Sequence, residues 1–396
     1  MTATRDGIDR RRFLALGAAA SGLAVGACDH RESISSDYAT AGMGYRSLGG
    51  TGLEVSEIAF GGDGPENPSL LIAAMDAGIN VVFTSPRYRD GRAQASIGRA
   101  IAELGSRRDD LIVFSGTGLT RNTSKQDILD TIDGSLRRLR TDHIEIFGVF
   151  QVETPQDLAF DPLYEAFAEA RAAGKVGHLG LTGHSGGMQQ CLEAAIEDGR
   201  FEVFLIKYDF VSYPDQDRIL RRASEQGIGT MVFKTGAGNR EQEIRDLEKN
   251  GLSYRQATVR WALTNPDVAS VCIRVTNFNQ IHEFVGAVGS PLSRAEIAML
   301  RRYAEDMYAS YCRFCRSCEA GCPHGVSVAD INRYAMYFKY DRRDKDAMQL
   351  YDQLPEHRSA AACASCTGLC EEGCPFGRNI RDELVEANRL LRFREA

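Results

Sequence analysis

Eight cysteines near the C-terminus have the types and spacing of metal-cluster ligands. They form two sets, a C-x2-C-x2-C-x3-C-P run and a C-x2-C-x3-C-x3-C-P run. The members are Cys312, Cys315, Cys318 and Cys322 in the first set and Cys363, Cys366, Cys370 and Cys374 in the second. Three closely spaced thiolates can hold one face of a 4Fe-4S cluster, and the proline turns the chain so that the fourth can reach a neighbouring cluster. The cysteines therefore predict two 4Fe-4S clusters.

Two other uses of cysteine fit these motifs less well. Zinc sites usually pair two C-x2-C knuckles, and a disulfide framework does not call for Cys-Pro at the end of each set. Of the 11 cysteines, the two sets leave Cys28, Cys191 and Cys272. Cys191 and Cys272 lie in apolar segments and are expected in the core.

The N-terminal residues 1–28 predict a twin-arginine signal peptide that ends in a lipobox. An arginine cluster precedes an apolar run over residues 13–28, which at 16 residues is shorter than a bilayer span of roughly 20. Arg11 and Arg12 begin a sequence that resembles the twin-arginine export motif, and residues 25–28 resemble a bacterial lipobox with Cys28 as the lipidated residue. Twin-arginine export carries folded proteins, which suits clusters inserted before export.

A diacyl chain on Cys28 would hold the mature protein at a membrane surface. Asp29 resembles the inner-membrane retention signal of bacterial lipoproteins, and the polar residues 29–44 read as a tether. The expected location is therefore the periplasmic face of the inner membrane, with a redox partner protein at that membrane. The formal charge of −7 gives no reason to expect a nucleic-acid partner.

Any further reactive side chains must be positioned by the middle of the chain. This part alternates short apolar runs with amphipathic helical patterns. Eight strands are expected, over residues 57–61, 80–84, 111–115, 144–150, 176–181, 203–207, 230–233 and 270–273. Residues 124–139 show helical spacing, Asp161 and Ser253 are candidate N-caps, and Gly78, Gly174, Gly199 and Gly227 are candidate helix-ending glycines. Eight strand–helix units predict an α/β fold, a (β/α)8 TIM barrel.

The 396 residues are enough for this barrel and a small second domain. We expect the barrel over residues 45–292, a connecting helix within 293–311 and the iron-sulfur domain over 312–396. Catalysis in such barrels occurs at the C-terminal ends of the strands. The side chains just past those ends are Asp63, Phe83, Arg87, Tyr88, Gly116, Phe150, His184, Tyr208, Lys234 and Arg274. Several cations on one rim would favour an anionic small molecule.

Residues 44–380 resemble the aldo-keto reductases, in particular the bacterial branch that has a C-terminal ferredoxin-like extension. The resemblance rests on Y-R-S-L-G-G-T-G-L-E-V-S at 45–56, D-A-G-I-N at 76–80, S-L-R-R-L-R-T-D at 135–142 and G-K-V-G-H-L-G-L-T-G-H at 174–184. A P-x-Y at 86–88 and A-T-V-R-W-A-L at 257–263 extend it. The resemblance implies the barrel, an oxidoreductase activity and a helical, ferredoxin-like second domain.

The family reduces carbonyls with NAD(P)H through a tetrad of Asp, Tyr, Lys and His, in which the Tyr protonates the carbonyl oxygen. Aligned with this chain, the Asp falls on Phe83, the Lys on Gly116 and the His on Phe150, whereas the Tyr falls on Tyr88. A phenol has a pKa of about 10 and is a weak acid at neutral pH without a neighbouring cation. Tyr88 is therefore the one candidate catalytic residue of the tetrad.

The resemblance also places nucleotide contacts on Tyr208, Lys234, Arg274, Asn277 and Gln280. Tyr208 corresponds to the aromatic residue that stacks on nicotinamide. Arg274 stands where the family usually has a glycine, and its side chain would crowd the approach of the pyrophosphate. An exported protein also meets no nicotinamide pool, so NAD(P)H is not the expected cofactor.

In ferredoxin-like domains of this branch the two cysteine sets share ligands. The resemblance implies one cluster on Cys312, Cys315, Cys318 and Cys374 and a second on Cys363, Cys366, Cys370 and Cys322. The helical insert between the sets is expected to pack on the barrel. The leading hypothesis is thus an exported electron-transfer protein with a barrel that has lost most of its tetrad. An NAD(P)H-dependent reductase that uses Tyr88, and a ligand- or partner-binding barrel with structural clusters, are the alternatives.

Overall fold

The computed structural model describes residues 42–64, 66–120, 122–150, 152, 154–183, 187–211, 216–237, 244, 248, 252–307, 311–341 and 343–392. The predicted signal peptide, Cys28, residues 29–41 of the predicted tether, and His184 lie outside the described residues. In the part of the chain that is described, no helix is long and apolar enough to cross a membrane.

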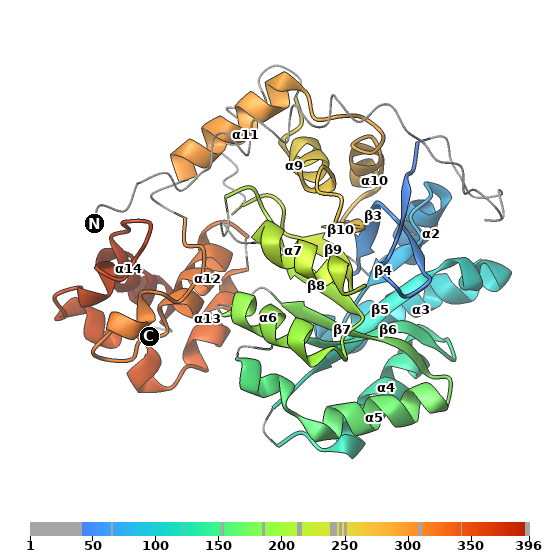
Figure 1. The fold of residues 1–396 in the computed structure, drawn as a ribbon, viewed down its shortest axis with the longest axis horizontal. Coiled ribbons are helices and arrows are strands. Elements are labelled where there is room, and N and C mark those ends of the chain that lie inside the picture. Colours follow the sequence, from blue (N-terminus) through green and yellow to red (C-terminus); the bar gives the residue numbers. More distant parts are fainter. Residues whose placement is uncertain are drawn as a thin grey trace.

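Eight parallel strands close into a barrel in the order β10-β3-β4-β5-β6-β7-β8-β9 (Figure 1). The strands are β3 (Ile58–Gly61), β4 (Val81–Phe83), β5 (Ile112–Gly118), β6 (Ile144–Phe150), β7 (Val176–Gly183), β8 (Val203–Lys207), β9 (Gly229–Phe233) and β10 (Ser270–Arg274). Every predicted strand is present, and the predicted TIM-barrel architecture is confirmed.

Helices surround the barrel because one face of each is apolar and covers the sheet. They are α2 (Pro68–Asp76), α3 (Arg92–Leu104), α4 (Lys125–Leu139), α5 (Asp161–Ala172), α6 (Met188–Asp198), α7 (Gln216–Glu225), α9 (Tyr254–Leu263) and α10 (Phe278–Val285). In α4, Ser124 and Asp127 form a capping box, and Ile128 and Ile132 face the core. Ser253 caps α9 as predicted. The prediction for Asp161 was wrong, because Phe160 occupies the N-cap position of α5 and Asp161 is its first residue.

The N-terminal end of the barrel is closed by a hairpin of β1 (Tyr45–Ser47) and β2 (Glu54–Ser56). Leu48 in its turn is fully buried and joins the interior cluster of the barrel. The backbone N–H of Gly50 donates to the carbonyl of Gly227 over 2.7 Å, which ties the hairpin to the segment before β9. The barrel is therefore sealed at the end opposite the expected active site.

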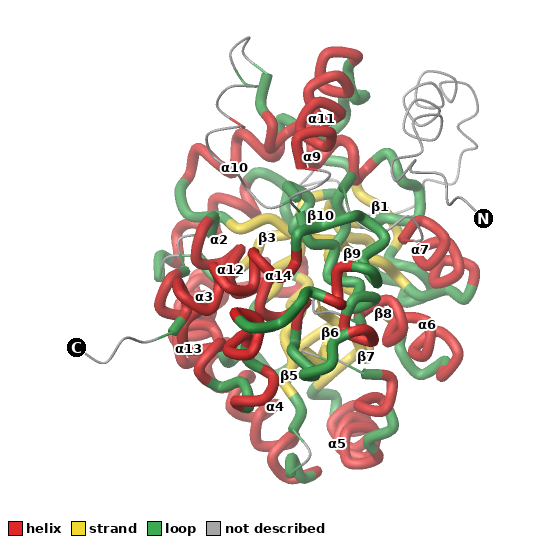
Figure 2. Tube along the Cα trace, turned by 90° about the vertical axis from the view of Figure 1, so that its left-hand side faces the viewer, coloured by secondary structure: helices red, strands yellow, loops and turns green. Residues whose placement is uncertain are grey.

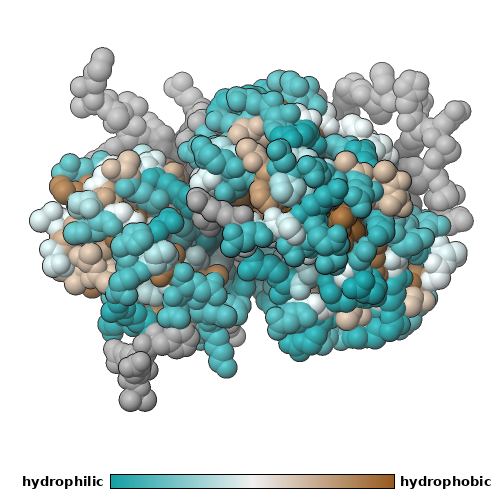
Figure 3. Space-filling view, turned by 90° about the horizontal axis from the view of Figure 1, so that it is seen from below, coloured by the Kyte–Doolittle hydropathy of each residue, from teal (hydrophilic) through white to brown (hydrophobic). Residues whose placement is uncertain are grey.

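Helix α11 (Arg294–Met307) leads from the barrel into a helical C-terminal domain with α12 (Val328–Lys339), α13 (Asp344–Asp352) and α14 (Ile380–Leu391). A second hydrophobic cluster forms there around Ile331, Tyr351 and Leu384. Figure 2, seen from the side of this domain, shows α12 and α14 in front of the barrel strands. The face in Figure 3 is mostly hydrophilic, and Phe278 and Leu369 are the large hydrophobic side chains that are exposed among the described residues.

Candidate functional site at the barrel mouth and the cysteine sets

Aromatic rings fill the barrel where the family has its proton-transfer groups. Phe83 ends β4 and Phe150 ends β6, and their ring centroids lie 5.7 Å apart in an edge-to-face contact. Phe114 of β5 contacts Phe83 at 5.3 Å in the same way. Such contacts stabilise a core but offer no exchangeable proton. The structure thus explains how the barrel packs without the tetrad.

Gly116 lies beneath the ring of Phe150. A Cβ atom at Gly116 would lie 1.9 Å from the carbonyl oxygen of Gly148 and 2.7 Å from Cε1 of Phe150. Any side chain here would collide with the strand backbone and with that ring. The residues at the lysine and histidine positions therefore fit each other, because the ring of Phe150 fills the space above Gly116.

Tyr88 begins a short 3-10 turn, η1 (Tyr88–Gly91), and its ring meets the edge of Phe83 at 6.1 Å. Burial, followed by the nearby Asp63, raises the pKa of the Tyr88 phenol above its ordinary value. Arg343 of the C-terminal domain acts in the opposite direction and lowers the pKa of Tyr88. The net effect keeps the phenol protonated and makes it a poorer acid at neutral pH.

The C-terminal domain covers the mouth of the barrel through Tyr337 of α12, whose side chain is 3% exposed. Nζ of Lys234, just after β9, donates to the Tyr337 hydroxyl over 3.3 Å and lies 4.7 Å from its ring centroid. Cζ of Arg343 lies 5.0 Å from the same centroid. Lys234 adopts a left-handed φ of 58°, a conformation that is strained for a side-chain-bearing residue. The domain thus contacts the strand end that a substrate would approach.

A second contact joins the end of β8 to the first cysteine set. Nζ of Lys207 forms a buried ion pair with Asp209 at 2.9 Å. The same Nζ lies 5.0 Å from the ring centroids of Tyr311 and Phe314, which flank Cys312. Arg313 donates to the carbonyl of Val211 over 3.3 Å. The first cysteine loop is therefore docked directly on the barrel.

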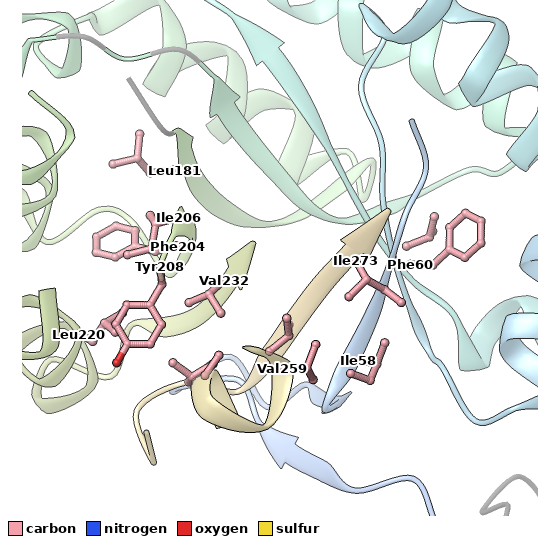
Figure 4. Close-up of a cluster of buried hydrophobic side chains, with 14 of the residues drawn as sticks. Ile58, Phe60, Leu181, Phe204, Ile206, Tyr208, Leu220, Val232, Val259 and Ile273 are labelled. Atoms are coloured by element: carbon pink, nitrogen blue, oxygen red, sulfur yellow. The ribbon is translucent and has the colours of Figure 1, made fainter. Parts of the chain in front are cut away.

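The candidate nucleotide contacts each have partners within the protein. Tyr208 stacks on Trp261 at 4.7 Å, donates to Asp217 over 2.6 Å and accepts from Asn265 over 3.1 Å. Figure 4 shows Tyr208 in the buried hydrophobic cluster that also contains Leu220 and Val232.

The remaining candidates have local partners around the start of α10. Arg274 is exposed and its Nε lies 3.4 Å from the carbonyl oxygen of Asp63. Asn277 caps α10 by accepting the N–H of Gln280 over 3.1 Å. The side chain of Gln280 accepts from the backbone of Thr276 over 2.7 Å. These side chains are engaged in local structure, and Lys234 in the contact with Tyr337.

The cysteines group as the crossed pattern implied by the family resemblance. Cys312, Cys315, Cys318 and Cys374 line one small cavity. Burial, then Cys312 with other neighbours that include Cys374, raises the pKa of Cys318 above its ordinary value. Burial, then the thiols of Cys322, Cys370 and Cys366, raises the pKa of Cys363 to about 11. Each group thus takes three cysteines from one set and the fourth from the other.

The backbone shows the same exchange. Gly373, just before Cys374, is so close to the first set that an added Cβ would lie 3.1 Å from the carbonyl oxygen of Ser317. Gly321, just before Cys322, would meet the carbonyl oxygen of Leu369 at 3.4 Å. The turn that carries each fourth cysteine therefore rests on the third-cysteine turn of the other set.

An internal repeat underlies this arrangement, and the sequence analysis missed it. Glu319 accepts the backbone N–H of Ala329 over 2.9 Å, and Glu371 accepts that of Arg381 over 2.9 Å. Each carboxylate follows a third cysteine and binds the first turn of the helix that comes next, α12 or α14. Aligning C-E-A-G-C-P-H-G with C-E-E-G-C-P-F-G would have revealed the repeat.

The thiols are free in this arrangement and receive hydrogen bonds. All ten described cysteines are free. Backbone N–H groups of Phe314, Val326 and Gly368 donate to Cys312, Cys322 and Cys366 over 3.4, 3.4 and 3.5 Å. Phe314 adopts a left-handed φ of 58° in order to turn its N–H inward. Such N–H to sulfur bonds are among the features that set cluster potentials.

The donor set has the number and type of ligands that two clusters require. Among the described residues, no three His, Cys, Asp or Glu side chains are close enough to hold one metal ion. A 4Fe-4S cluster is bound by four thiolates on separate irons, so its ligands need not converge on one point. Two groups of four thiols, partly buried and hydrogen-bonded, suit that requirement.

Comparison with known proteins identifies relatives of the barrel. The model of the aldo/keto reductase family matches residues 63–245. The oxidoreductase YrpG of Bacillus subtilis is 26% identical over 313 residues, which are 65% of this chain and 95% of YrpG. The aldo-keto reductase YhdN of the same organism is 32% identical over 162 residues, which are 36% of this chain and 48% of YhdN.

Among solved structures, an aldo-keto reductase from Bacillus halodurans in its holo form is similar to this chain, with a TM-score of 0.55 and 21% identity. The similarity covers 66% of this chain and 96% of that one, and it shows the common fold. The cysteine sets lie beyond the segment that the family model matches. Residues 63–245, which make up most of the barrel, are thus similar to the aldo/keto reductase family.

Proposed function

We propose that this protein is an iron-sulfur redox protein, in which an aldo/keto reductase barrel supports a ferredoxin-like electron-transfer domain with two 4Fe-4S clusters. The observation that carries the proposal is the crossed grouping of the eight cysteines. One cluster would be held by Cys312, Cys315, Cys318 and Cys374, and the other by Cys363, Cys366, Cys370 and Cys322. When bound, such clusters accept and donate single electrons.

The barrel supports the proposal because three of its four tetrad positions carry no proton-transfer group. Phe83, Gly116 and Phe150 provide no group that could hold or transfer a proton. Tyr88 remains, but burial raises its pKa and keeps the proton in place. The role of the barrel is therefore to bind and orient the C-terminal domain through Lys207 and Lys234.

The N-terminal sequence suggests where the protein works. The twin-arginine motif at Arg11 and Arg12 would export the folded chain, and lipid on Cys28 would anchor it at the periplasmic face of the inner membrane. A redox partner at that membrane would then exchange electrons with the C-terminal domain. Globomycin blocks removal of lipoprotein signal peptides, so treatment should cause the precursor to accumulate. If a Cys28→Ser variant is processed in the same way as the wild type, the lipid anchor is contradicted.

Anaerobic purification with iron and sulfide analysis tests the proposal. We expect about eight irons per chain, four for each cluster, and a visible absorbance that bleaches on reduction with an EPR signal. Cys366→Ser should remove about half of the iron, whereas the matched variant Cys191→Ser, in a buried core cysteine outside the two sets, should keep all of it. Protein that binds zinc, or no metal, would overturn the proposal.

One observation favours a second function, an NAD(P)H-dependent reductase built on Tyr88. Arg343 is a cation that lowers the pKa of Tyr88 and could partly replace the missing lysine. Titration of NADPH followed by fluorescence separates the two functions. Saturable binding that is lost in Tyr208→Ala would favour the reductase, and absence of binding would favour electron transfer alone. Clusters that cannot be reduced reversibly would instead indicate a binding barrel with structural clusters.

A further inference from the structure

Three arginines line the cavity that contains the inner group of thiols, defined as Cys312, Cys315, Cys318 and Cys374. They are Arg313, Arg316 and Arg378, and none of the described residues that line the cavity with them is acidic. A guanidinium is always charged in a protein. The inner group therefore faces three fixed positive charges.

These arginines are held in place by partners that lie outside the cavity. Arg316 pairs with Asp330 at 3.2 Å, and Arg378 pairs with Glu383. Arg313 donates to backbone carbonyls and lies 4.2 Å above the ring of Phe376. Coulomb energies fall with distance, so the guanidinium groups at the cavity wall act more strongly on its contents than the carboxylates behind them.

Burial strengthens the effect. The exposed fraction is 2% for Arg313 and 6% for Arg378, because the barrel and α12 cover this side of the domain. Charges that are removed from water are screened little by solvent or salt. An electron added to a cluster that the inner group binds would therefore be stabilised by nearby cations in a medium of low polarity.

The outer group of thiols, Cys322, Cys363, Cys366 and Cys370, has different surroundings. Glu371 follows Cys370 as Glu319 follows Cys318, so a carboxylate beside the third cysteine is common to both groups and does not distinguish them. Arg381 donates to the carbonyl of Ala364, next to Cys363, over 3.1 Å; its side chain is 38% exposed and is paired with Asp382 at 3.2 Å. Leu369, inside this loop, is 47% exposed. The outer group thus has a partly exposed, paired cation beside it, whereas the cavity of the inner group is lined by three arginines, two of them buried.

We propose that Arg313, Arg316 and Arg378 give the inner cluster a higher reduction potential than the outer one. An electron delivered by a one-electron donor at the outer surface would then reside mainly on the inner cluster, which lies beside the barrel. The inference rests on the proposed function, because it requires both clusters. Net charge and solvent exposure are recognised determinants of cluster potential.

Hydrogen bonds do not explain the difference. Phe314 and Ser317 donate to the inner group, and Val326 and Gly368 donate to the outer group. Water at the outer group also stabilises an added electron, so it opposes the proposed order. The arginine variants, which change one charge at a time, therefore carry the test.

The test is a potentiometric titration followed by EPR on the full chain purified anaerobically. We expect two midpoints. Arg378→Gln should lower the higher midpoint by the equivalent of at least a tenfold change in the reduction equilibrium, about 59 mV for one electron. Arg378→Lys should keep most of the wild-type value, because it retains the charge.

Two further variants keep the result interpretable. Arg316→Gln removes a less buried cation from the same cavity and should lower the same midpoint, which covers the case in which Arg378→Gln fails to fold. Arg381→Gln is the matched control beside the outer group and should change only the lower midpoint. The inference is overturned if Arg378→Gln and Arg316→Gln shift the lower midpoint or neither midpoint. Absence of iron in the wild-type protein would instead contradict the proposed function.

Discussion

The barrel mouth and the cysteine domain differ in whether the side chains expected for their chemistry are present. The mouth keeps the regular (β/α)8 framework, but Phe83, Gly116 and Phe150 stand where proton-transfer groups are expected. The C-terminal domain has irregular loops between its helices, yet its thiols form two complete groups of four. A fold and the chemistry placed on it are separable.

The largest effect that separates the two regions should come from Phe114→Ala. Phe114 is fully buried in the barrel interior and contacts Phe83. Truncation should lower the free energy of unfolding by about 3–5 kcal/mol, since it leaves a cavity. Denaturant unfolding measures this, and iron per folded chain should stay at the wild-type level. Loss of iron together with stability would mean that the two regions fold as one unit.

Lys207→Met should have the next largest effect. It leaves the carboxylate of Asp209 buried without its ion-pair partner. We expect a loss of about 3 kcal/mol, at the lower end for a broken buried pair, because Met retains the side-chain volume. The exposed pair of Lys125 and Glu169 offers the control, since Lys125→Met should change stability far less. Equal effects of the two variants would contradict a stabilising buried ion pair at the end of β8.

Tyr337→Phe should have a small effect of about 1 kcal/mol. The change removes the hydrogen bond from Lys234 but keeps the ring beneath both cations. Tyr337→Ala removes the ring as well and should make the segment after β9 more accessible to limited proteolysis. If both variants are cleaved as slowly as the wild type, the domain does not cover the mouth in solution.

Tyr88→Phe should have the smallest effect. If electron transfer is the function, both midpoints and the iron content should be unchanged, because the phenol holds its proton and takes no part. The raised pKa of Tyr88 also predicts that the folded protein keeps this proton above the pH at which the unfolded chain loses it. Stability that depends on Tyr88 should therefore decline as the pH rises above about 10 and not below it. A decline at neutral pH that the variant abolishes would assign Tyr88 a chemical role.

The sequence predicted the barrel well because apolar runs and glycines mark the strands and helix ends. Gly78 and Gly174 have the expected left-handed conformation, with φ of 90° and 72°. Strand β5 extends to Gly118, beyond the predicted end at residue 115, because its glycines pair with β6 although they carry no apolar side chain. Pairing between strands, not local composition, determines this boundary.

The site was predicted only in part. Motif alignment located the tetrad replacements, but not the ring of Phe150 above Gly116. The contact of Lys234 with Tyr337 joins residues 103 positions apart and depends on how two domains dock. Nothing local in either segment indicates it. The two cysteine sets can be recognised from the sequence because their spacing is a local property, and their use as cluster ligands stays a prediction.

The backbone exchange at Gly321 and Gly373 bears on how the protein is made. Because each fourth-cysteine turn rests on the other set, neither set has its full surroundings until the chain has been synthesised through Cys374. The first cluster should therefore be loaded late, after translation of nearly the whole chain, because its fourth ligand is Cys374. A truncated chain that ended just before Cys374 would lose this ligand but keep all four thiols of the second group, so the order in which the two sites are completed follows from the crossed arrangement.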